Sequence, residues 1–253
     1  MLIKHVKPSE GYTWLRQGFW LFKQNPFTFL MLVFLYVFVV QLSMFIPLLG
    51  IITMMVLTPA FSVGFMSACQ QVIRKERVVP SIYLIALRSL GPTVRSNILK
   101  LGLVYAVIVF LLSLIASQFV DFEKLIPLVS DQQISSAAMV RELYLALVVG
   151  ALLYCPVAMI MWFAPVLVAW QGMPISKAMF SSWMTCWQNR GAFLVYAIVW
   201  GVILIATPLF LEALMDGIGL SQYASFIITP FSMAAVTVLY CSFFATWKGC
   251  LSE

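Results

Sequence analysis

Residues 174–202 read PISKAMFSSWMTCWQNRGAFLVYAIVWGV, and this stretch contains the unit from which the whole chain is built. At about 100° per residue, one half of the helix predicted before Gln188 is apolar. That half holds Ile175, Met179, Phe180, Trp183, Met184, Cys186 and Trp187, whereas Lys177, Ser181, Thr185 and Gln188 lie opposite. An apolar run from Gly191 to Leu211 follows the polar corner Gln188-Asn189-Arg190. The pattern predicts an amphipathic helix on a membrane surface and then a helix that enters the bilayer.

The composition of the whole chain agrees with a membrane location. Of its 253 residues, 63% are hydrophobic and 9% are charged, and the mean hydropathy is +1.01. Soluble domains carry about 25% charged residues, so we interpret residues 1–253 as a single integral membrane domain. The formal net charge of +6 sits beside apolar segments, where basic side chains meet anionic phospholipid headgroups. We therefore expect the lipid bilayer, and not nucleic acid, as the partner.

Six spanning helices are predicted in an all-α, polytopic fold. They cover about residues 27–47, 51–71, 98–119, 143–170, 191–211 and 222–247. Further amphipathic surface helices are expected at 9–25 and 81–97, the latter interrupted by Gly91-Pro92. The fourth predicted span is roughly 42 Å long, against a hydrocarbon core of about 30 Å, so it should tilt or bend. Pro156 and Pro165 offer places to bend.

The distribution of basic residues predicts the orientation. Thirteen basic residues fall on the side that holds both termini and the surface helices: Lys4, Lys7, Arg16, Lys23, Arg74, Lys75, Arg77, Arg88, Arg95, Lys100, Lys177, Arg190 and Lys248. Two, Lys124 and Arg141, fall on the other side, in or beside an acidic loop that carries Asp121, Glu123, Asp131 and Glu142. Cytoplasmic loops of membrane proteins are enriched in Lys and Arg, so both termini should be cytoplasmic.

A threefold repeat of helix pairs is a further interpretation. Three asparagines, Asn25, Asn97 and Asn189, each precede an outward span, and we expect them to cap the helices that follow. Each following inward span carries one proline, namely Pro59, Pro156 or Pro230. Asparagine contacts with a ligand are the alternative to capping.

Two interpretations of the prolines remain open. In the first, Pro59, Pro156, Pro165 and Pro230 only kink helices, and neighbouring groups satisfy the freed carbonyls. In the second, broken helices meet near the bilayer midplane and form a cavity or gate, as in transporters built from repeats. Thr58, Ser62 and Thr229 would then line that cavity. Hydrogen bonding between helices is the simpler role for such hydroxyl groups.

Catalytic and metal-binding patterns are missing from the predicted spans. The spans as predicted contain no Asp, Glu, His or Arg and one Lys, Lys100 near the start of the third span, and the sole histidine, His5, lies in the N-terminal tail. A histidine-based metal site and a Ser-His-Asp triad are therefore excluded. The sequence also lacks a GxxxxGK[ST] loop that would hold a nucleotide phosphate. We expect no cofactor, no metal and no enzymatic activity.

Two stretches carry a resemblance to a known group of proteins. They are Phe163 to Asn189 and Leu57 to Cys69, the latter reading LTPAFSVGFMSAC. They resemble uncharacterised six-helix bacterial inner-membrane proteins, a group similar to the membrane portion of membrane-anchored glycerophosphodiester phosphodiesterases. The resemblance implies a bacterial inner-membrane location. The chain has no room for the phosphodiesterase catalytic domain, so that activity is not implied.

Two functions follow from the sequence. The first is a non-enzymatic inner-membrane protein that associates with lipids or with partner membrane proteins through its cytoplasmic surface helices. The alternative is a carrier or flippase for a small apolar or lipid-like substrate, which would need no charge within the bilayer. A closed bundle would favour the first function. A cleft lined by Thr58, Ser62 and Thr229 would favour the second.

Overall fold

The computed structural model describes residues 2–46, 48–121 and 136–252, and nearly all of the elements in these ranges are helices. In chain order they are α1 (Glu10–Gln24), α2 (Pro26–Ser43), α3 (Leu49–Ile73), α4 (Ile82–Arg88), α5 (Pro92–Ser117), α7 (Ser136–Met161), α8 (Ala164–Gln171), α9 (Ile175–Gln188), α10 (Arg190–Gly201), α11 (Thr207–Gly217) and α12 (Ala224–Cys250). A π-helical segment, Val202–Ala206, joins α10 to α11, and a 3-10 turn, Ser221–Tyr223, precedes α12. Glu123, Lys124 and Asp131 of the predicted acidic loop lie outside the described ranges.

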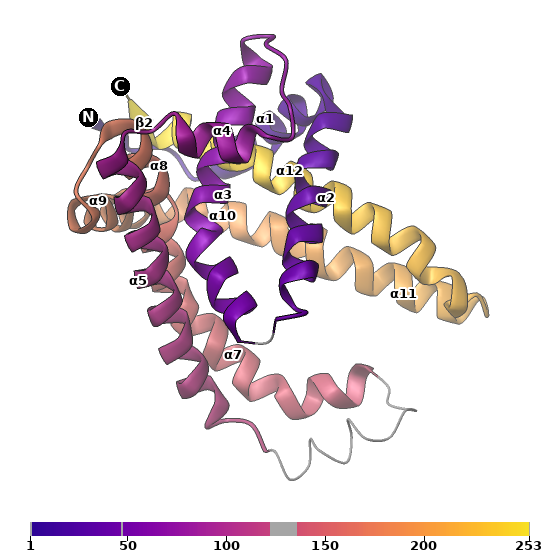
Figure 1. The fold of residues 1–253 in the computed structure, drawn as a ribbon. Helices are drawn as coiled ribbons and strands as arrows, with labels where there is room; N and C mark the ends of the chain where they lie inside the picture. The colour runs from indigo at the N-terminus through magenta and orange to yellow at the C-terminus, as the bar shows by residue number, and fades with distance from the viewer. Residues whose placement is uncertain (1, 47, 122–135, 253) are drawn as a thin grey trace.

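Six stretches are long and apolar enough to span a membrane, which confirms the predicted fold class. They are Pro26–Ser43, Leu49–Ile73, Pro92–Ser117, Leu143–Gln171, Arg190–Gly217 and Ser221–Cys250. Both termini lie at one end of the bundle, beside α1, α4 and α9, and the spans extend away from that end (Figure 1). A short antiparallel pair of strands, β1 (Leu2–Ile3) and β2 (Leu251–Ser252), joins the two termini. The sequence did not predict this pairing.

The third span begins earlier than predicted, and the surface helix expected at 81–97 is shorter than predicted, because only α4 belongs to it. Helix α4 ends at Arg88, and Gly91 is the N-cap of α5, which starts at Pro92. Proline suits the first turn of a helix because its missing N–H has no partner there in any case. Asn97 consequently lies inside α5, so the predicted helix cap at Asn97 is also wrong.

The fourth span is broken between Met161 and Ala164, just before Pro165 in the first turn of α8. A serine from α9 satisfies the backbone groups that the break exposes. The Phe163 N–H donates to Ser182 Oγ at 2.9 Å, and the Ser182 hydroxyl donates to the Met159 carbonyl at 2.7 Å. Irregular backbone at membrane depth is tolerated when protein groups bind it in this way.

Helix α1 packs closely against α10 and α12. Its buried residues are Gly11, Trp14, Gly18 and Leu21, which recur every three or four positions and form one helical face. A Cβ atom at Gly18 would lie 2.7 Å from Ser242 Cα, so only glycine permits this approach. Tyr12 and Phe19, which lie outside this buried face, are exposed and are available to lipid.

Helix α9 shows the same division between a protein-facing side and an outer side. Its buried residues are Ala178, Ser182, Thr185 and Cys186. On the outer side Phe180 and Trp187 are exposed, and the rings of Trp183 and Trp187 stack with centroids 5.9 Å apart. Small and polar side chains thus face the bundle, whereas large aromatic rings face outward as at a membrane interface.

Candidate functional site

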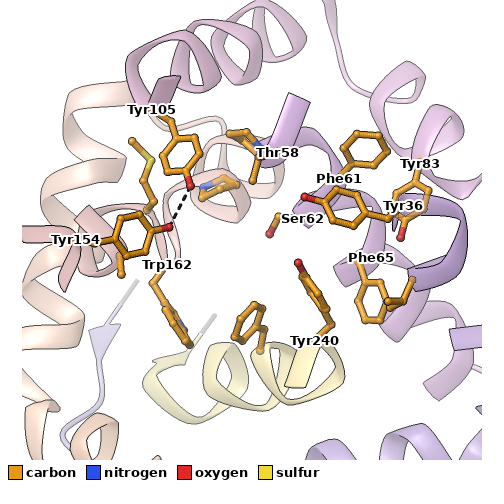
Figure 2. A pocket seen from close by; sticks show the side chains of 16 residues that line it. Tyr36, Thr58, Phe61, Ser62, Phe65, Tyr83, Tyr105, Tyr154, Trp162 and Tyr240 are labelled. Carbon is orange, nitrogen blue, oxygen red and sulfur yellow. Dashed lines mark hydrogen bonds between the residues drawn. The ribbon is translucent and has the colours of Figure 1, made fainter. Parts of the chain in front are cut away.

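A cavity of about 430 Å³ lies where several spans meet near their middle, and Figure 2 shows the side chains around it. Its lining is mostly aromatic and comes from several helices and from Trp162, which lies between α7 and α8. The other lining residues are Val33 and Tyr36 of α2; Thr58, Pro59, Phe61, Ser62 and Phe65 of α3; Tyr83 of α4; Tyr105 of α5; Tyr154, Ala158 and Met161 of α7; Pro165 of α8; and Tyr240 and Phe243 of α12. All of these residues are uncharged. The site is therefore an uncharged cavity that is lined mainly by aromatic rings and carries several hydroxyl groups.

Tyrosine hydroxyls supply most of the polar atoms in this cavity. Tyr105 of α5 and Tyr154 of α7 are joined by a hydrogen bond of 3.0 Å between their hydroxyl oxygens. The hydroxyls of Tyr36 and Tyr240 point toward Ser62 in the middle of the cavity (Figure 2). These groups can donate to, or accept from, a ligand with a carbonyl or hydroxyl group.

Aromatic rings packed edge to face form much of the cavity wall. The ring centroids of Phe61 lie 5.2 Å from Tyr36 and 5.1 Å from Tyr83. On the opposite side Trp162 and Phe243 are 4.6 Å apart, and the Trp162 indole N–H donates to Thr246 Oγ1 at 3.1 Å. Such pairs add stability beyond the area they bury, so the wall is held in place without a ligand.

Tyr83 reaches the cavity because Gly64 leaves room for it. A Cβ atom at Gly64 would lie 3.0 Å from Tyr83 Cα and closer still to its ring. The Tyr83 hydroxyl donates to the Leu32 carbonyl at 3.1 Å. Burial raises the pKa of Tyr83 well above its usual range, because an ionised phenol is poorly solvated there. Tyr83 is therefore a neutral donor at physiological pH.

The structure brings together only some of the predicted site residues. Thr58, Ser62, Pro59 and Pro165 line the cavity. Thr229 does not line the cavity. It is exposed, like Pro230, in the first turns of α12. Tyr240, at which α12 meets the cavity, lies about three turns further along the helix. The predicted lining by Thr229 is wrong.

The interpretation in which Pro59, Pro156 and Pro230 meet at a cavity or gate is also wrong, because only Pro59 of the three lines the cavity. Pro156 is exposed on α7 and, like Pro230, lies away from the cavity. Pro59, Pro156 and Pro230 each lie inside a helix that continues past the proline. These prolines therefore do not meet, and Pro165 is the one that coincides with a broken span.

The two remaining asparagines have different roles. Asn25 is the N-cap of α2, and its side-chain oxygen accepts from the Thr28 N–H at 3.4 Å. Asn189 occupies the N-cap position of α10, but its side chain makes no capping bond. Instead its oxygen accepts from the Val6 N–H at 2.8 Å, and its nitrogen donates to the Lys4 carbonyl at 2.9 Å. The predicted side-chain cap at Asn189 is wrong, because this side chain binds the N-terminal segment.

The tyrosines of the cavity are the residues that the sequence analysis missed. A signal for them exists in the sequence. Tyr36, Tyr105 and Tyr154 lie well inside predicted or observed spans, whereas tyrosines of an aromatic belt lie near the ends of spans. A tyrosine far from both ends of a span needs a partner for its hydroxyl, which indicates a polar contact within the bundle.

Comparison with known proteins yields a relative from another bacterium. A probable inner membrane protein of Burkholderia thailandensis is 38% identical over 253 residues, and the match covers 99% of this chain and 94% of the relative. No family model matches the chain, and no solved structure matches it. The full-length match places the chain in the inner membrane.

Proposed function

The chain belongs to the family of this probable inner membrane protein, and from that premise we propose that it is a non-enzymatic protein that associates with lipid. The observation that carries the proposal is the uncharged, tyrosine-rich cavity between its spans. The ligand that suits this cavity is a lipid-like molecule with one or two uncharged polar groups.

The chemistry of the cavity wall supports an uncharged ligand. A charged metabolite would lose its hydration inside the bilayer, and the wall offers no counter-charge to compensate. A hydrocarbon segment can instead lie against rings such as Phe61 and Phe243, while Tyr105 and Tyr154 bind a carbonyl or hydroxyl oxygen. The volume of about 430 Å³ lies within the range of about 300–1,000 Å³ typical of small-molecule sites.

Photo-crosslinking tests this proposal. The full chain is reconstituted in phosphatidylcholine vesicles that contain a diacylglycerol with a diazirine on one acyl chain. We expect crosslinks at Phe61 and Tyr105, and a loss of these crosslinks when Ser62→Trp fills the cavity. Ser113→Trp, on an exposed part of α5, is the matched control and should leave them unchanged. Crosslinks confined to outward residues such as Phe110 in both variants would exclude ligand binding in the cavity.

A carrier or flippase is the second candidate, and one observation favours it. The cavity touches Trp162 and Pro165, where the fourth span is broken, and broken helices surround the substrate in many transporters. Fluorescent-lipid flipping in reconstituted vesicles separates the two candidates. Movement that Ser62→Trp abolishes supports a carrier, whereas crosslinking without movement supports lipid association alone.

The orientation and the wider lipid contacts belong to the same proposal. Arg74, Lys75, Arg88, Lys177 and Arg190 all lie at the end of the bundle that holds the termini. Basic residues of this kind favour the cytoplasmic side and anionic phospholipid headgroups. The similarity to the membrane portion of glycerophosphodiester phosphodiesterases, and an association with partner membrane proteins, remain predictions from the sequence.

A further inference from the structure

A second pocket lies between α1 and α12, at the end of the bundle that holds the termini. Its volume is about 360 Å³. Unlike the tyrosine cavity, it is lined by two charged residues, Glu10 of α1 and Lys248 of α12, together with apolar side chains. It therefore combines features of a headgroup site with features of an acyl-chain site.

Trp14 forms part of the wall of this pocket. Its side chain is 1% exposed, and its indole nitrogen has no hydrogen-bond partner among the residues that the structure describes. Gly249, which also lines the pocket, packs closely against that nitrogen, because a Cβ atom at Gly249 would lie 2.4 Å from it. This nitrogen is therefore enclosed by protein, and the pocket instead offers a ligand the polar groups of its charged residues.

The two charged residues of the pocket are not paired with each other. Across the described ranges neither Glu10 nor Lys248 makes an ion pair. The Lys248 ammonium lies over the Phe244 ring, 5.1 Å from its centroid. Glu10 lies in the first turn of α1. One pocket thus presents a cation and an anion, and neither of them is part of an ion pair within the described ranges.

We infer that this pocket binds the zwitterionic headgroup of a phosphatidylethanolamine molecule. The phosphate accepts a hydrogen bond from Lys248, and the primary ammonium of the lipid donates to Glu10. Phosphatidylglycerol has no cation to offer Glu10, and the quaternary ammonium of phosphatidylcholine has no N–H to donate.

The source of the headgroup is a membrane lipid and not a free phosphate ester. Leu21, Ile73 and Phe244 line the same pocket, and their apolar surfaces suit the start of the acyl chains. The inference goes beyond the proposed function, because it concerns a different pocket and the charged end of a lipid.

Native mass spectrometry of the detergent-solubilised full chain tests the inference with three lipids of identical acyl chains. Phosphatidylethanolamine should be retained about tenfold more than phosphatidylglycerol or phosphatidylcholine, the ratio that one charge-assisted hydrogen bond provides. Glu10→Gln should remove this preference over phosphatidylglycerol. Lys248→Gln should weaken retention of both lipids. Glu76→Gln and Lys177→Gln, two exposed positions outside the pocket, are the matched controls.

Several results would overturn the inference. One is equal retention of the three lipids by the unmodified chain, and another is an unchanged preference in Glu10→Gln. Displacement of the lipid by soluble O-phosphoethanolamine at the same concentration would instead indicate a site for the free headgroup. Ser62→Trp, which fills the tyrosine cavity, should leave the headgroup preference intact, so the two proposals fail separately.

Discussion

At the scale of single residues, Asn189 binds the N-terminal segment as a neighbouring β-strand would. Its side-chain amide accepts from Val6 N–H and donates to the Lys4 carbonyl, two residues apart on one extended segment. It also donates to the Thr185 carbonyl at 3.0 Å, and the residue is 1% exposed. Lys4 N–H in turn donates to the Cys250 carbonyl at 2.9 Å. The Asn189 side chain therefore connects the corner between α9 and α10 to the N-terminal segment, and the Lys4 backbone connects that segment to the C-terminus.

Replacing this side chain should loosen the N-terminus. Asn189→Ala leaves buried backbone groups without partners, and we expect a loss of about 2–4 kcal/mol in the free energy of unfolding. Asn25→Ala, which removes one longer capping bond, should cost only about 1 kcal/mol. Chemical denaturation in detergent measures both values, and proteolysis should cut the N-terminal segment faster in Asn189→Ala alone. Equal losses in the two variants would show that Asn189 acts as a cap after all.

Cys186 should be an unreactive thiol. It is buried on the inner side of α9, and its sulfur lies 3.6 Å from the Met159 carbonyl oxygen. Burial raises the pKa of the Cys186 thiol far above its usual range, so the thiol stays protonated as the pH rises through the range in which an exposed cysteine ionises.

Alkylation rates measure this difference. In a chain whose only cysteine is Cys186, labelling by N-ethylmaleimide at pH 8 should be more than about tenfold slower than in a chain whose only cysteine is Gln188→Cys, an exposed site. The rate at Cys186 should stay low up to pH 9. Similar rates for the two cysteines would contradict the buried position of Cys186.

The sequence could identify some residues of the cavity and not others. Thr58 and Ser62 are recognisable, because a hydroxyl group inside an apolar span needs a hydrogen-bond partner. Tyr105 and Tyr154 are harder to assign, because a tyrosine ring suits a lipid-facing surface, a belt or a core equally well. Their roles depend on how α5 and α7 cross, which the sequence of either helix alone does not determine.

At the scale of elements, glycine decides how closely α1 approaches the spans. Gly18 lies against Ser242 of α12, whose hydroxyl is 2.5 Å from the Tyr196 hydroxyl of α10. Three helices therefore meet at this glycine. Small residues allow such close contacts between membrane helices.

A pair of glycine substitutions tests this contact. Gly18→Ala places a methyl group against the Ser242 backbone, and we expect a loss of about 1–3 kcal/mol in stability. Gly201→Ala is the matched control, because a Cβ atom there would have nothing within 4 Å, and it should be neutral or raise stability by up to about 1 kcal/mol. Thermal unfolding in detergent, followed by circular dichroism, compares the two. A neutral Gly18→Ala would mean that α1 is not packed as closely as the structure indicates.

The boundaries of the elements were less predictable than their number. Apolar runs predict six spans because the bilayer sets their length. The start of α5 depends on Gly91-Pro92, a local signal that could have been given more weight. The break before Pro165 depends on Ser182, which lies on another helix and accepts from the freed Phe163 N–H. A partner of this kind becomes visible only once the helices are packed.

At the scale of the whole molecule, the two termini and the basic residues share one end of the bundle (Figure 1). The pairing of β1 with β2 holds the termini together, which is possible because an even number of spans returns the chain to the side on which it began. Each third of the chain also has a short helix followed by long ones, α1 before α2, α4 before α5 and α9 before α10. The proposed threefold repeat remains a prediction, because its middle asparagine, Asn97, is not at a helix start.

The last prediction concerns which end of the helical bundle faces the cytoplasm. Arg77 lies at the end with the termini, and Gln222 lies in the turn between α11 and α12 at the opposite end. Both are exposed. With the five native cysteines replaced by alanine, Gln222→Cys should react with a membrane-impermeant maleimide in cells whose outer membrane has been permeabilised. Arg77→Cys should react only after the inner membrane is also opened, because basic flanking residues resist translocation.

A reporter at the C-terminus provides an independent check on the same orientation. The pairing of β2 with β1 holds both termini on the same side, which the basic residues predict to be the cytoplasmic side. A fluorescent protein fused after residue 253 should therefore fold in the cytoplasm, and a fused alkaline phosphatase should remain inactive. The reverse pattern, together with labelling of Arg77→Cys from outside, would place the basic end in the periplasm. The pocket that holds Glu10 and Lys248 would then face the opposite leaflet, so the orientation also decides which leaflet supplies its lipid.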